Sequence, residues 1–568
     1  MDGLTPPEKF LLAPRSAWIA VPLAFAIGAA YAWYLFGTDF VLGTADFWRR
    51  PRGNMGGRLD MASVLSAYDW FVADDWRWPL LSIPRASWPE GANAFALDVA
   101  PLVAILGKLI RTLTGQHINL YPLWHVLTFA LPAALLTAAV RGMGQRSLAA
   151  ALLGGAMGAL SPMVHLRFGH AAQLAHWLPV AALALYFSAN RRWRLPGLLG
   201  LALLAAMVNL YLFVMVAAVA GAAFLQEWAD GRISITHFLV LALALPVAGF
   251  LPVWSFGLLG MPNLTTGEIE FGSFSMNILS LFWPQTSGAL QWTGIPLLTG
   301  EALDGTGGQY EGYAYLGLGA LLLLVGSLWL NRRRLWPALR HHWALALVCL
   351  VLVAWALSNE IYIGTFMLLW FPLPQFLLDT ILAWFRSAGR FIWPVAWLLV
   401  ALGIAGIFSA RRRTILVLLC LAIGLQWADL SVWRGRIAVL VAAAQPSAFG
   451  DNAVAAHLER EIAARGLVTI IPPFFCSSSG GNYEGIHNIA ASETQLMAAR
   501  GNAHMRWTLT ARGKPDCAGA ATTALPLLMA DGVLIVLADK ETVDRTDEAR
   551  GKMDCRDFAL GVVCAGPK

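Results

Sequence analysis

The chain has 568 residues, of which 58% are hydrophobic and 13% are charged, and its formal net charge is +6. The mean hydropathy of +0.60 excludes an ordinary soluble protein, which could not bury so much apolar surface, and indicates a membrane protein. The basic residues are spread along the chain in short clusters, so the positive charge does not indicate a nucleic-acid partner.

Apolar stretches recur along the chain, and a helix needs about 20 apolar residues to cross a bilayer. We therefore predict an all-α polytopic membrane protein with about eleven transmembrane helices. The run 195–226 is too long for one span, and we divide it at Asn209, a polar residue that can cap a second helix. The predicted spans are residues 17–36, 118–140, 147–164, 172–189, 196–208, 210–226, 237–259, 313–330, 343–358, 390–409 and 414–430.

The arginine-rich loops between these spans all fall on one side of the membrane, the side of an N-terminus that carries Lys9 and Arg15. Because Lys and Arg in short loops favour the cytoplasm, we expect a cytoplasmic N-terminus. The first apolar run is long enough to stay as a span, so no cleavable signal is predicted. The opposite side then receives the first loop (37–117), residues 260–312, residues 360–389 and the region beyond residue 431.

The first loop carries two carboxylates, Asp60 and Asp98, that are each bracketed by small or apolar residues. We predict that both are partly buried, where a carboxylate can act as a general base toward a hydroxyl. For Asp98 a helix cap or packing partner is an equal alternative, and Asp74 and Asp75 read as solvated loop charges. An amphipathic helix is expected near residues 98–110, and membrane-surface positions are expected for Trp70, Trp76, Trp78 and Trp88.

Two arginine-bearing segments at the predicted outer ends of spans are candidates for binding an anion. The first holds His165, Arg167 and His170, and the second holds Arg386 and Arg390. Guanidinium groups suit phosphate oxygens, and ionisable groups at membrane depth tend to mark substrate paths. Alternatively, Arg167 reaches the interface while the histidines pack in the core. The second pair opposes the positive-inside bias, so it requires an anionic partner, either a protein carboxylate or a lipid phosphate.

A turn rich in glycine and amide groups holds Gln309, Tyr310 and Glu311, and residues 271–277 precede it. These residues either line a polar pocket that binds substrate or form simple loop ends. The sequence contains no Walker A motif, no dinucleotide-binding glycine motif after a strand, no Ser-His-Asp signature and no HExxH motif.

The pattern of residues 431–568 predicts a small extracytoplasmic α/β domain. It has a predicted helix over 452–465 and predicted strands over 467–471 and 533–538. It holds four cysteines, and no spacing suggests zinc. Four cysteines on the outer side fit two disulfides in an oxidising compartment. Three pairings are open, and we favour Cys476–Cys517 and Cys555–Cys564.

Several of these segments together resemble an uncharacterised family of bacterial multi-pass membrane proteins placed near the GT-C glycosyltransferase superfamily. The likeness covers roughly residues 15–430 in order. It runs through residues 57–60, 68–80, 96–101, 165–177, 274–277, 307–317 and 385–394. In GT-C enzymes the first outer loop carries a catalytic Asp, and a polyprenyl-linked donor reacts on the extracytoplasmic side. The tight pair of acidic residues found after the first span in several branches is missing here.

The resemblance implies a GT-C-like transmembrane domain over residues 1–430 in the bacterial inner membrane, followed by a periplasmic domain over 431–568. It implies an inverting glycosyltransferase with a polyprenyl-phosphate-linked sugar donor and a glycan or lipid acceptor. Asp60 would be the general base and Asp98 would orient the acceptor. Arg167, Arg386 and Arg390, with the weaker candidates His165 and His170, would bind the donor phosphate. No cofactor is certain, and a divalent metal stays open.

Two readings from other classes remain. A transporter or flippase of a lipid-linked saccharide could use the same arginines to hold phosphate in transit, although no duplicated halves are evident. A non-enzymatic membrane scaffold for envelope polysaccharide would lack any site shared by Asp60 and the arginines.

Overall fold

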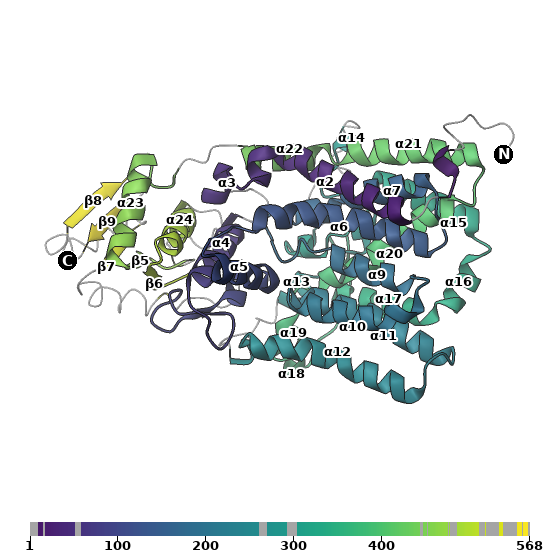
Figure 1. The fold of residues 1–568 in the computed structure, drawn as a ribbon, viewed down its shortest axis with the longest axis horizontal. Helices are drawn as coiled ribbons and strands as arrows, with labels where there is room; N and C mark the ends of the chain where they lie inside the picture. The colour runs from purple at the N-terminus through teal and green to yellow at the C-terminus, as the bar shows by residue number, and fades with distance from the viewer. Residues whose placement is uncertain are drawn as a thin grey trace.

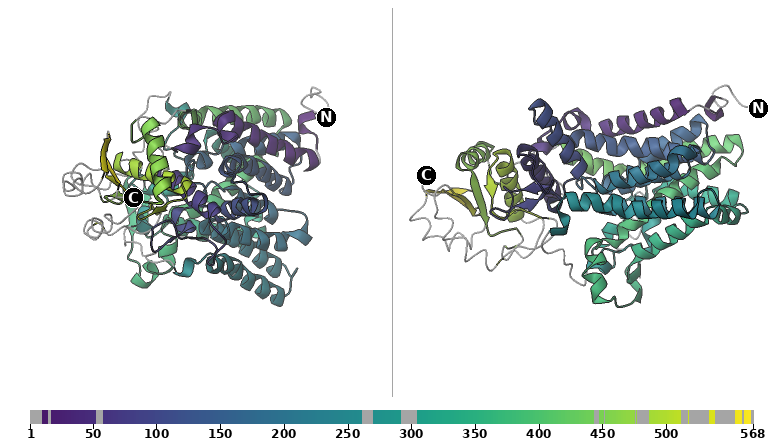
Figure 2. Two further views of the ribbon diagram at one scale, coloured as in Figure 1. Left: turned by 60° about the vertical axis from the view of Figure 1, so that its left-hand side comes forward. Right: turned by 60° about the horizontal axis from the view of Figure 1, so that its bottom comes forward.

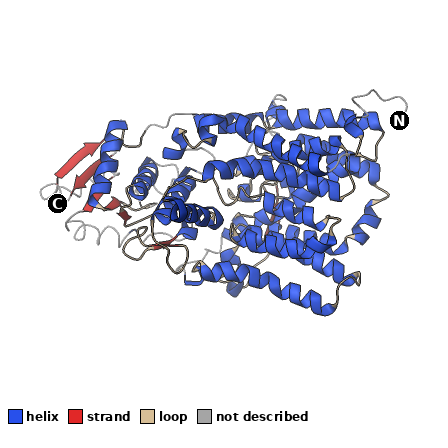
Figure 3. Cartoon of the chain, in the orientation of Figure 1, coloured by secondary structure: helices blue, strands red, loops and turns tan. Residues whose placement is uncertain are grey.

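The computed structural model describes residues 10–14, 17–51, 58–260, 270–291, 304–442, 447–450, 452–474, 476, 486–510, 517, 533–537, 554–558 and 561–565. The molecule is elongated, with a helical bundle at one end and a small sheet at the other (Figure 1). The purple N-terminal helix lies in the bundle and the yellow strands β8 (Asp554–Phe558) and β9 (Gly561–Ala565) lie toward the opposite end, which the two turned views in Figure 2 also show. Helices dominate the bundle, and the largest sheet lies beside the C-terminus (Figure 3).

The bundle consists of apolar helices whose outer faces are not covered by protein. On α12, Leu239, Val240 and Leu243 are all more than half exposed, which only a lipid environment makes favourable. The main bundle helices are α2 (Ala17–Val41), α6 (Tyr121–Gly142), α7 (Leu148–Ala159), α8 (Pro162–Leu166), α9 (Trp177–Tyr186), α10 (Arg191–Ala206), α11 (Leu210–Ala229), α12 (Ile235–Ser255), α15 (Leu318–Asn331), α16 (Leu335–His341), α17 (Trp343–Leu357), α20 (Trp393–Ile407), α21 (Arg412–Asp429) and α22 (Ser431–Ala442).

Within the described residues, six helices are long and apolar enough to cross a membrane, or up to eight when each sharply bent pair counts as one span. The two bent pairs are α16 with α17 and α21 with α22. Shorter apolar helices, among them α9 and α15, accompany them. The chain is therefore a mostly helical membrane protein, as the composition predicts.

The predicted division of the run 195–226 is confirmed. Helix α10 ends at Ala206, α11 begins at Leu210, and Asn209 is the N-cap between them. The Asn209 side chain accepts a hydrogen bond from the Tyr211 N–H at 2.9 Å, which satisfies one of the unpaired donors at the start of α11.

Small residues allow the first helices to pack closely. Gly154 and Gly158, one turn apart on α7, face Thr137 and Ala133 of α6, where a Cβ on either glycine would meet backbone atoms at or below 3.0 Å. Without a hydrophobic driving force between helices in lipid, such close backbone approach is a main source of helix association. These contacts hold α7 against α6.

The first loop folds into a compact layer on one end of the bundle. The amphipathic helix predicted near residues 98–110 is α5 (Pro101–Thr114), and Asp60 lies in the first turn of α4. The prediction for Trp70 is wrong, because its indole is fully buried and donates to the Ala503 carbonyl at 2.9 Å. Trp76 and Trp78 are exposed. The other elements are α3 (Asp46–Arg49), α4 (Arg58–Ala73), β1 (Ser82–Ile83), β2 (Ala92–Asn93) and η1 (Ala94–Leu97).

Two further groups of short elements cover the same end of the bundle, following α12 and α17 in the chain. They are η2 (Leu258–Gly260), α13 (Glu270–Ser273), η3 (Ile278–Leu281), α14 (Gly288–Gln291), η5 (Gln309–Gly312), β3 (Glu360–Ile363), β4 (Phe366–Trp370), α18 (Gln375–Leu378), α19 (Ile381–Trp384) and η6 (Ala388–Ile392).

The terminal region forms a five-stranded mixed sheet in the order β6-β5-β7-β9-β8, with β5 parallel to both neighbours and β9 antiparallel to both of its own. The predicted helix 452–465 and strand 467–471 coincide with α23 and β5, and the predicted strand 533–538 corresponds to β7. The elements are α23 (Asn452–Arg465), β5 (Leu467–Ile471), α24 (Ile486–Arg500), β6 (His504–Met505), β7 (Val533–Leu537), β8 (Asp554–Phe558) and β9 (Gly561–Ala565).

The cysteines of this region follow the favoured pairing where the structure describes them. Cys476 and Cys517 form a disulfide. The antiparallel register of β8 and β9 sets Cys555 directly opposite Cys564, whose side chains lie outside the described part.

The terminal region is hydrogen-bonded to the first loop. Gln495 of α24 is fully buried, donates to the Ser66 hydroxyl at 2.7 Å and accepts from the Leu509 N–H at 2.8 Å. Ser63 donates to the Leu509 carbonyl at 3.0 Å. Buried polar groups of this kind are costly to leave unpaired, so they fix one arrangement of the two parts.

Candidate functional site

Two arginines from distant parts of the chain share one buried carboxylate. Arg167 Nη1 lies 2.7 Å from Glu311 Oε2, and Arg390 approaches the same carboxylate with Nε at 2.9 Å and Nη2 at 2.7 Å. We call Arg167, Glu311 and Arg390 the arginine–glutamate cluster. The paired geometry of Arg390 on both carboxylate oxygens is the strong, directional form of this interaction. The anionic partner that Arg390 requires is therefore a protein carboxylate.

Glycines bring the elements of this cluster together. Glu311 lies in η5 and Arg390 in η6, and each is followed or preceded by a glycine, Gly312 and Gly389. A Cβ on Gly389 would meet the Gly312 backbone, including its nitrogen at 2.8 Å. The glycine-rich turn seen in the sequence thus allows two backbones to touch, so that the carboxylate and guanidinium meet.

Aromatic rings and backbone carbonyls surround the two guanidinium groups. The Arg167 guanidinium lies 5.3 Å from the Trp393 ring centre, and that of Arg390 lies 4.8 Å from the Tyr211 ring centre. Arg167 Nη2 also donates to the Glu311 carbonyl at 2.8 Å, and Nη1 lies 3.2 Å from Gln173 Oε1. Sequence reasoning missed Tyr211 and Gln173, although Gln173 stands only three residues after His170.

The cluster carries one net positive charge, because two guanidinium groups share one carboxylate. Burial alone would raise the pKa of Glu311, but the adjacent Arg167 and Arg390 outweigh it and hold that pKa well below its usual range. Glu311 therefore stays ionised and the positive charge persists at neutral pH.

Asp60 contacts His170 beside this cluster. Asp60 Oδ2 lies 3.2 Å from His170 Nδ1, and the two side chains are 20% and 12% exposed. Burial lowers the pKa of His170, an effect that Asp60 opposes and Arg167 reinforces. The imidazole is therefore neutral near pH 7, and the contact joins a neutral ring to the carboxylate rather than forming an ion pair.

Asp98 borders the same site. It lies within electrostatic range of Arg390 and follows η1, where its backbone adopts φ 59°. A left-handed conformation is uncommon for a residue other than glycine, so the local fold forces it at this position. Asp98 is thus the C-cap of η1, as one of the two alternatives for it expected, and its charge reaches Arg390.

The remaining predicted site residues do not all join the cluster. His165 is fully buried inside the bundle, where its Nδ1 donates to the Ser161 carbonyl at 2.7 Å and its Nε2 accepts from the Tyr31 hydroxyl at 2.6 Å. Both ring nitrogens are thus used by the protein. The other predicted anion ligand, Arg386, is half-buried, with its guanidinium 5.8 Å from the Phe274 ring centre.

The Gln309 and Tyr310 side chains frame the turn that carries Glu311. The Gln309 amide oxygen accepts from Asn277 Nδ2 at 2.9 Å and from the Gly305 N–H at 3.1 Å. Tyr310 is 40% exposed and contributes its carbonyl to Arg167 at 3.2 Å. The Gln309 side chain is thus buried and hydrogen-bonded within the protein, whereas the Tyr310 side chain reaches the surface.

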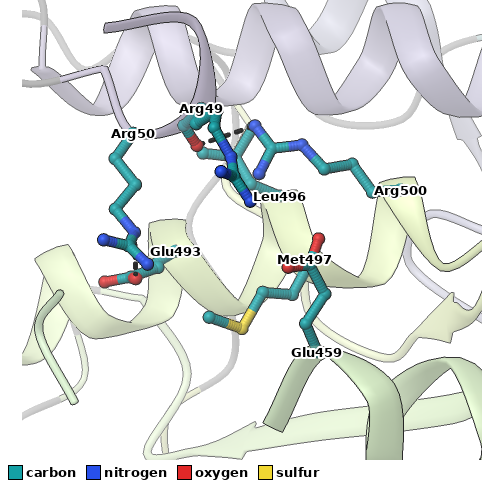
Figure 4. A pocket seen from close by; sticks show the side chains of 7 residues that line it. All are labelled: Arg49, Arg50, Glu459, Glu493, Leu496, Met497 and Arg500. Atoms are coloured by element: carbon teal, nitrogen blue, oxygen red, sulfur yellow. Dashed lines mark hydrogen bonds and ion pairs between the residues drawn. The ribbon is translucent and has the colours of Figure 1, made fainter. Parts of the chain in front are cut away.

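The structure also shows a small pocket away from these residues, where the first loop meets the terminal region (Figure 4). Arg50 Nε lies 3.0 Å from Glu493 Oε1, and Arg500 Nη2 donates to the Arg49 carbonyl at 2.7 Å. None of the residues predicted for the site lines this pocket. We interpret the pocket as part of a structural contact, in which these polar interactions join the end of α3 to α24.

No three His, Cys, Asp or Glu side chains group as metal ligands in the part of the chain that the structure describes. Of the carboxylates near the cluster, Glu311 contacts two guanidinium groups and Asp60 contacts an imidazole.

The fold and these contacts define a helical membrane protein with a buried charged cluster at the end of the bundle that carries the first loop. Residues 25–431 match a family described as a domain of unknown function (DUF6311), and the chain belongs to that family. Among curated proteins, none matches this chain.

Proposed function

We propose that this protein is a GT-C-type glycosyltransferase that moves a sugar from a polyprenyl-phosphate-linked donor to an envelope glycan or lipid acceptor. The observation that supports the proposal is the contact of Asp60 with His170, at 3.2 Å, beside the positively charged arginine–glutamate cluster. A base and a positive charge are the two groups that such a transfer needs. The GT-C resemblance of the sequence favours the same reading.

In the proposed reaction Asp60 takes the proton of the acceptor hydroxyl, whose oxygen attacks the anomeric carbon of the donor sugar. The bond between that carbon and the phosphate oxygen breaks, and the phosphate leaves with the electron pair. Attack opposite the leaving phosphate inverts the anomeric centre. His170 holds one oxygen of Asp60 in place, and Asp98 orients the acceptor.

The arginines contribute mainly through their charge in this proposal. Glu311 engages Arg167 and Arg390, so their net positive charge acts on the phosphate through space, and Arg386 nearby contacts it. A fixed charge aimed at a group that becomes more negative stabilises the transition state more than the ground state. The half-exposed Tyr310 borders the path of the substrate.

We further propose that the shorter helices α9, α10 and α15 complete a set of eleven spans with the N-terminus in the cytoplasm. The first loop, the site and the terminal region beyond α22 would then face the periplasm, and the prenyl chain would lie between lipid-facing helices. The terminal region, which is hydrogen-bonded to the first loop, would help to bind the acceptor.

A gene deletion followed by mass spectrometry of surface glycans and lipid-linked intermediates tests this proposal. We expect the deletion strain to lose one sugar from a surface polymer and to accumulate the donor lipid that still carries this sugar. Wild-type protein should restore the sugar, and Asp60→Asn, expressed at the same level, should not. Asp75→Asn is the matched control, because Asp75 is an exposed carboxylate of the same loop and should restore the sugar fully.

Restoration by Asp60→Asn would remove Asp60 from the base role. Purified protein that carries labelled lipid across a vesicle membrane with its headgroup unchanged would instead establish the transporter reading.

A further inference from the structure

The hairpin formed by β3 and β4 exposes an unusual amount of apolar surface. All five residues of β4 are exposed, with Phe366 at 66% and Trp370 at 56%. Successive residues of a strand point to opposite sides, so both faces of β4 are apolar and uncovered. The same surface continues into Phe376 of α18 and Ile381 at the start of α19. No charged residue occurs between Glu360 and Asp379.

The hairpin is fixed to the protein through its turn and its inner strand. The Asn277 side chain donates to the Gly364 carbonyl at 2.8 Å and accepts from the Gly364 N–H at 3.0 Å. Asn277 also bonds Gln309, two residues from Glu311. Strand β3 pairs with β4 in a two-stranded sheet, so β4 is the outer strand among those described. The exposed face is therefore held in a defined place rather than hanging free.

The neighbouring segments place this surface at the membrane. The chain leaves the candidate span α16–α17 at Leu357 and enters the candidate span Ala388–Ile407 thirty residues or so later, at the same end of the bundle. The hairpin therefore lies close to the level where these helices leave the hydrocarbon.

Physical chemistry excludes two locations for such a hairpin. In water, a flat apolar edge strand pairs with other chains and aggregates. In the hydrocarbon core, the unpaired N–H and C=O groups of its outer edge would each cost several kcal/mol. The headgroup layer satisfies both requirements, because water and headgroups bond the backbone edge while acyl chains cover the side chains.

We propose that residues 360–381 form an interfacial element that lies in the bilayer surface at the end of the bundle bearing the first loop. Its partner is the lipid bilayer itself. The element borders the arginine–glutamate cluster through Asn277 and Gln309, so it sets the depth of that cluster relative to the membrane. This inference is independent of the proposed glycosyl transfer.

Photo-crosslinking of the full chain in phosphatidylethanolamine and phosphatidylglycerol nanodiscs tests the proposal. Benzoylphenylalanine replaces Phe366, Leu368 or Leu369, which sample the two faces of β4. Exposed Ala464 of α23, at the far end of the molecule, is the control position (Figure 1). We expect all three β4 positions to yield about tenfold more lipid adduct by mass spectrometry than Ala464.

Lipid adducts no more frequent than at Ala464 would overturn the proposal, as would adducts on only one face of β4. Crosslinks from β4 to another segment of this chain, or to a second copy, would show that protein covers the hairpin and would equally overturn it. The three substituted side chains are exposed, so each variant is expected to keep the elution profile of the wild type.

Discussion

The protonation state of His170 determines what its contact with Asp60 can do at neutral pH. A neutral ring leaves the negative charge on the carboxylate, where a general base needs it. A protonated ring would form an ion pair and weaken that base. The buried position of His170 favours the first state.

This state predicts the pH dependence of transfer. Because the pKa of His170 lies below its ordinary value of about 6.5, the rate should stay level between about pH 6.5 and 8 and fall only at more acidic pH. His170→Gln keeps an N–H donor and should retain most of kcat, whereas His170→Phe should lower kcat about tenfold with little change in KM. Rate profiles against pH for the three proteins measure this, and a wild-type inflection near pH 7 would contradict it.

Glu311 stabilises the fold by compensating two buried cations. Replacement by Gln leaves Arg167 and Arg390 without their anion, which costs about 3–5 kcal/mol for a buried pair. We expect Glu311→Gln to lower the thermal midpoint in detergent strongly. The depressed pKa of Glu311 makes its contribution complete above about pH 4.3, and the contribution is lost as pH falls below that value.

Glu227→Gln is the matched control for this change. Glu227 also pairs with two arginines, Arg194 and Arg232, but their side chains are 18% and 31% exposed. Water therefore compensates these charges in part, and we expect a loss of about 1 kcal/mol or less. Equal losses of stability in the two variants would show that burial of the arginine–glutamate cluster is not the reason that Glu311 stabilises the fold.

At the level of elements, the cluster depends on how closely η5 and η6 approach. Gly389→Ala should force the two backbones apart, because its Cβ would meet the Gly312 backbone, which cannot rotate away. We expect a loss of about 1–3 kcal/mol and a severe loss of transfer, since Arg390 would leave Glu311. Gly424→Ala in α21 is the control, where a Cβ meets open space and better helix propensity should leave the protein unchanged or slightly stabilised.

Thermal unfolding and transfer assays on the two glycine variants test whether the cluster depends on this close approach. If Gly389→Ala behaved like Gly424→Ala, close packing of η5 on η6 could not be the reason that these turns contain glycine.

Patterns among neighbouring residues predict the helices and strands well, but they cannot predict contacts between residues that are far apart in the sequence. The break at Asn209 and strand β5 follow from capping and apolar periodicity, which are properties of neighbouring residues. The pairing of Glu311 with Arg167 joins residues 144 positions apart, so no spacing in the sequence reveals it. The surface position predicted for Trp70 is wrong for the same reason. The residues that bury its indole belong to the terminal region, far away in the sequence.

At the scale of the whole molecule, charge separates the two ends. The loop before α16, which carries three arginines, lies at one end of the molecule, and the sheet lies at the opposite end (Figure 1). Cys476, which follows β5 of that sheet in the chain, forms a disulfide. Arginine-rich short loops favour the cytoplasm, and disulfides persist in oxidising compartments. Two independent properties of the sequence thus support the proposed orientation of the molecule in the membrane.

This orientation can be measured with single cysteines and a membrane-impermeant maleimide, in a background where Cys349 and Cys420 are alanine. We expect Ala464→Cys of α23 to react in spheroplasts, and Arg333→Cys before α16 to react only after the membrane is disrupted. The background protein without added cysteine is the control. It should stay unlabelled, because Cys476 and Cys517 are bonded and we expect Cys555 and Cys564, which lie opposite each other in β8 and β9, to be bonded as well. The reverse pattern would place Asp60 on the cytoplasmic side, where a periplasmic lipid-linked donor could not reach it.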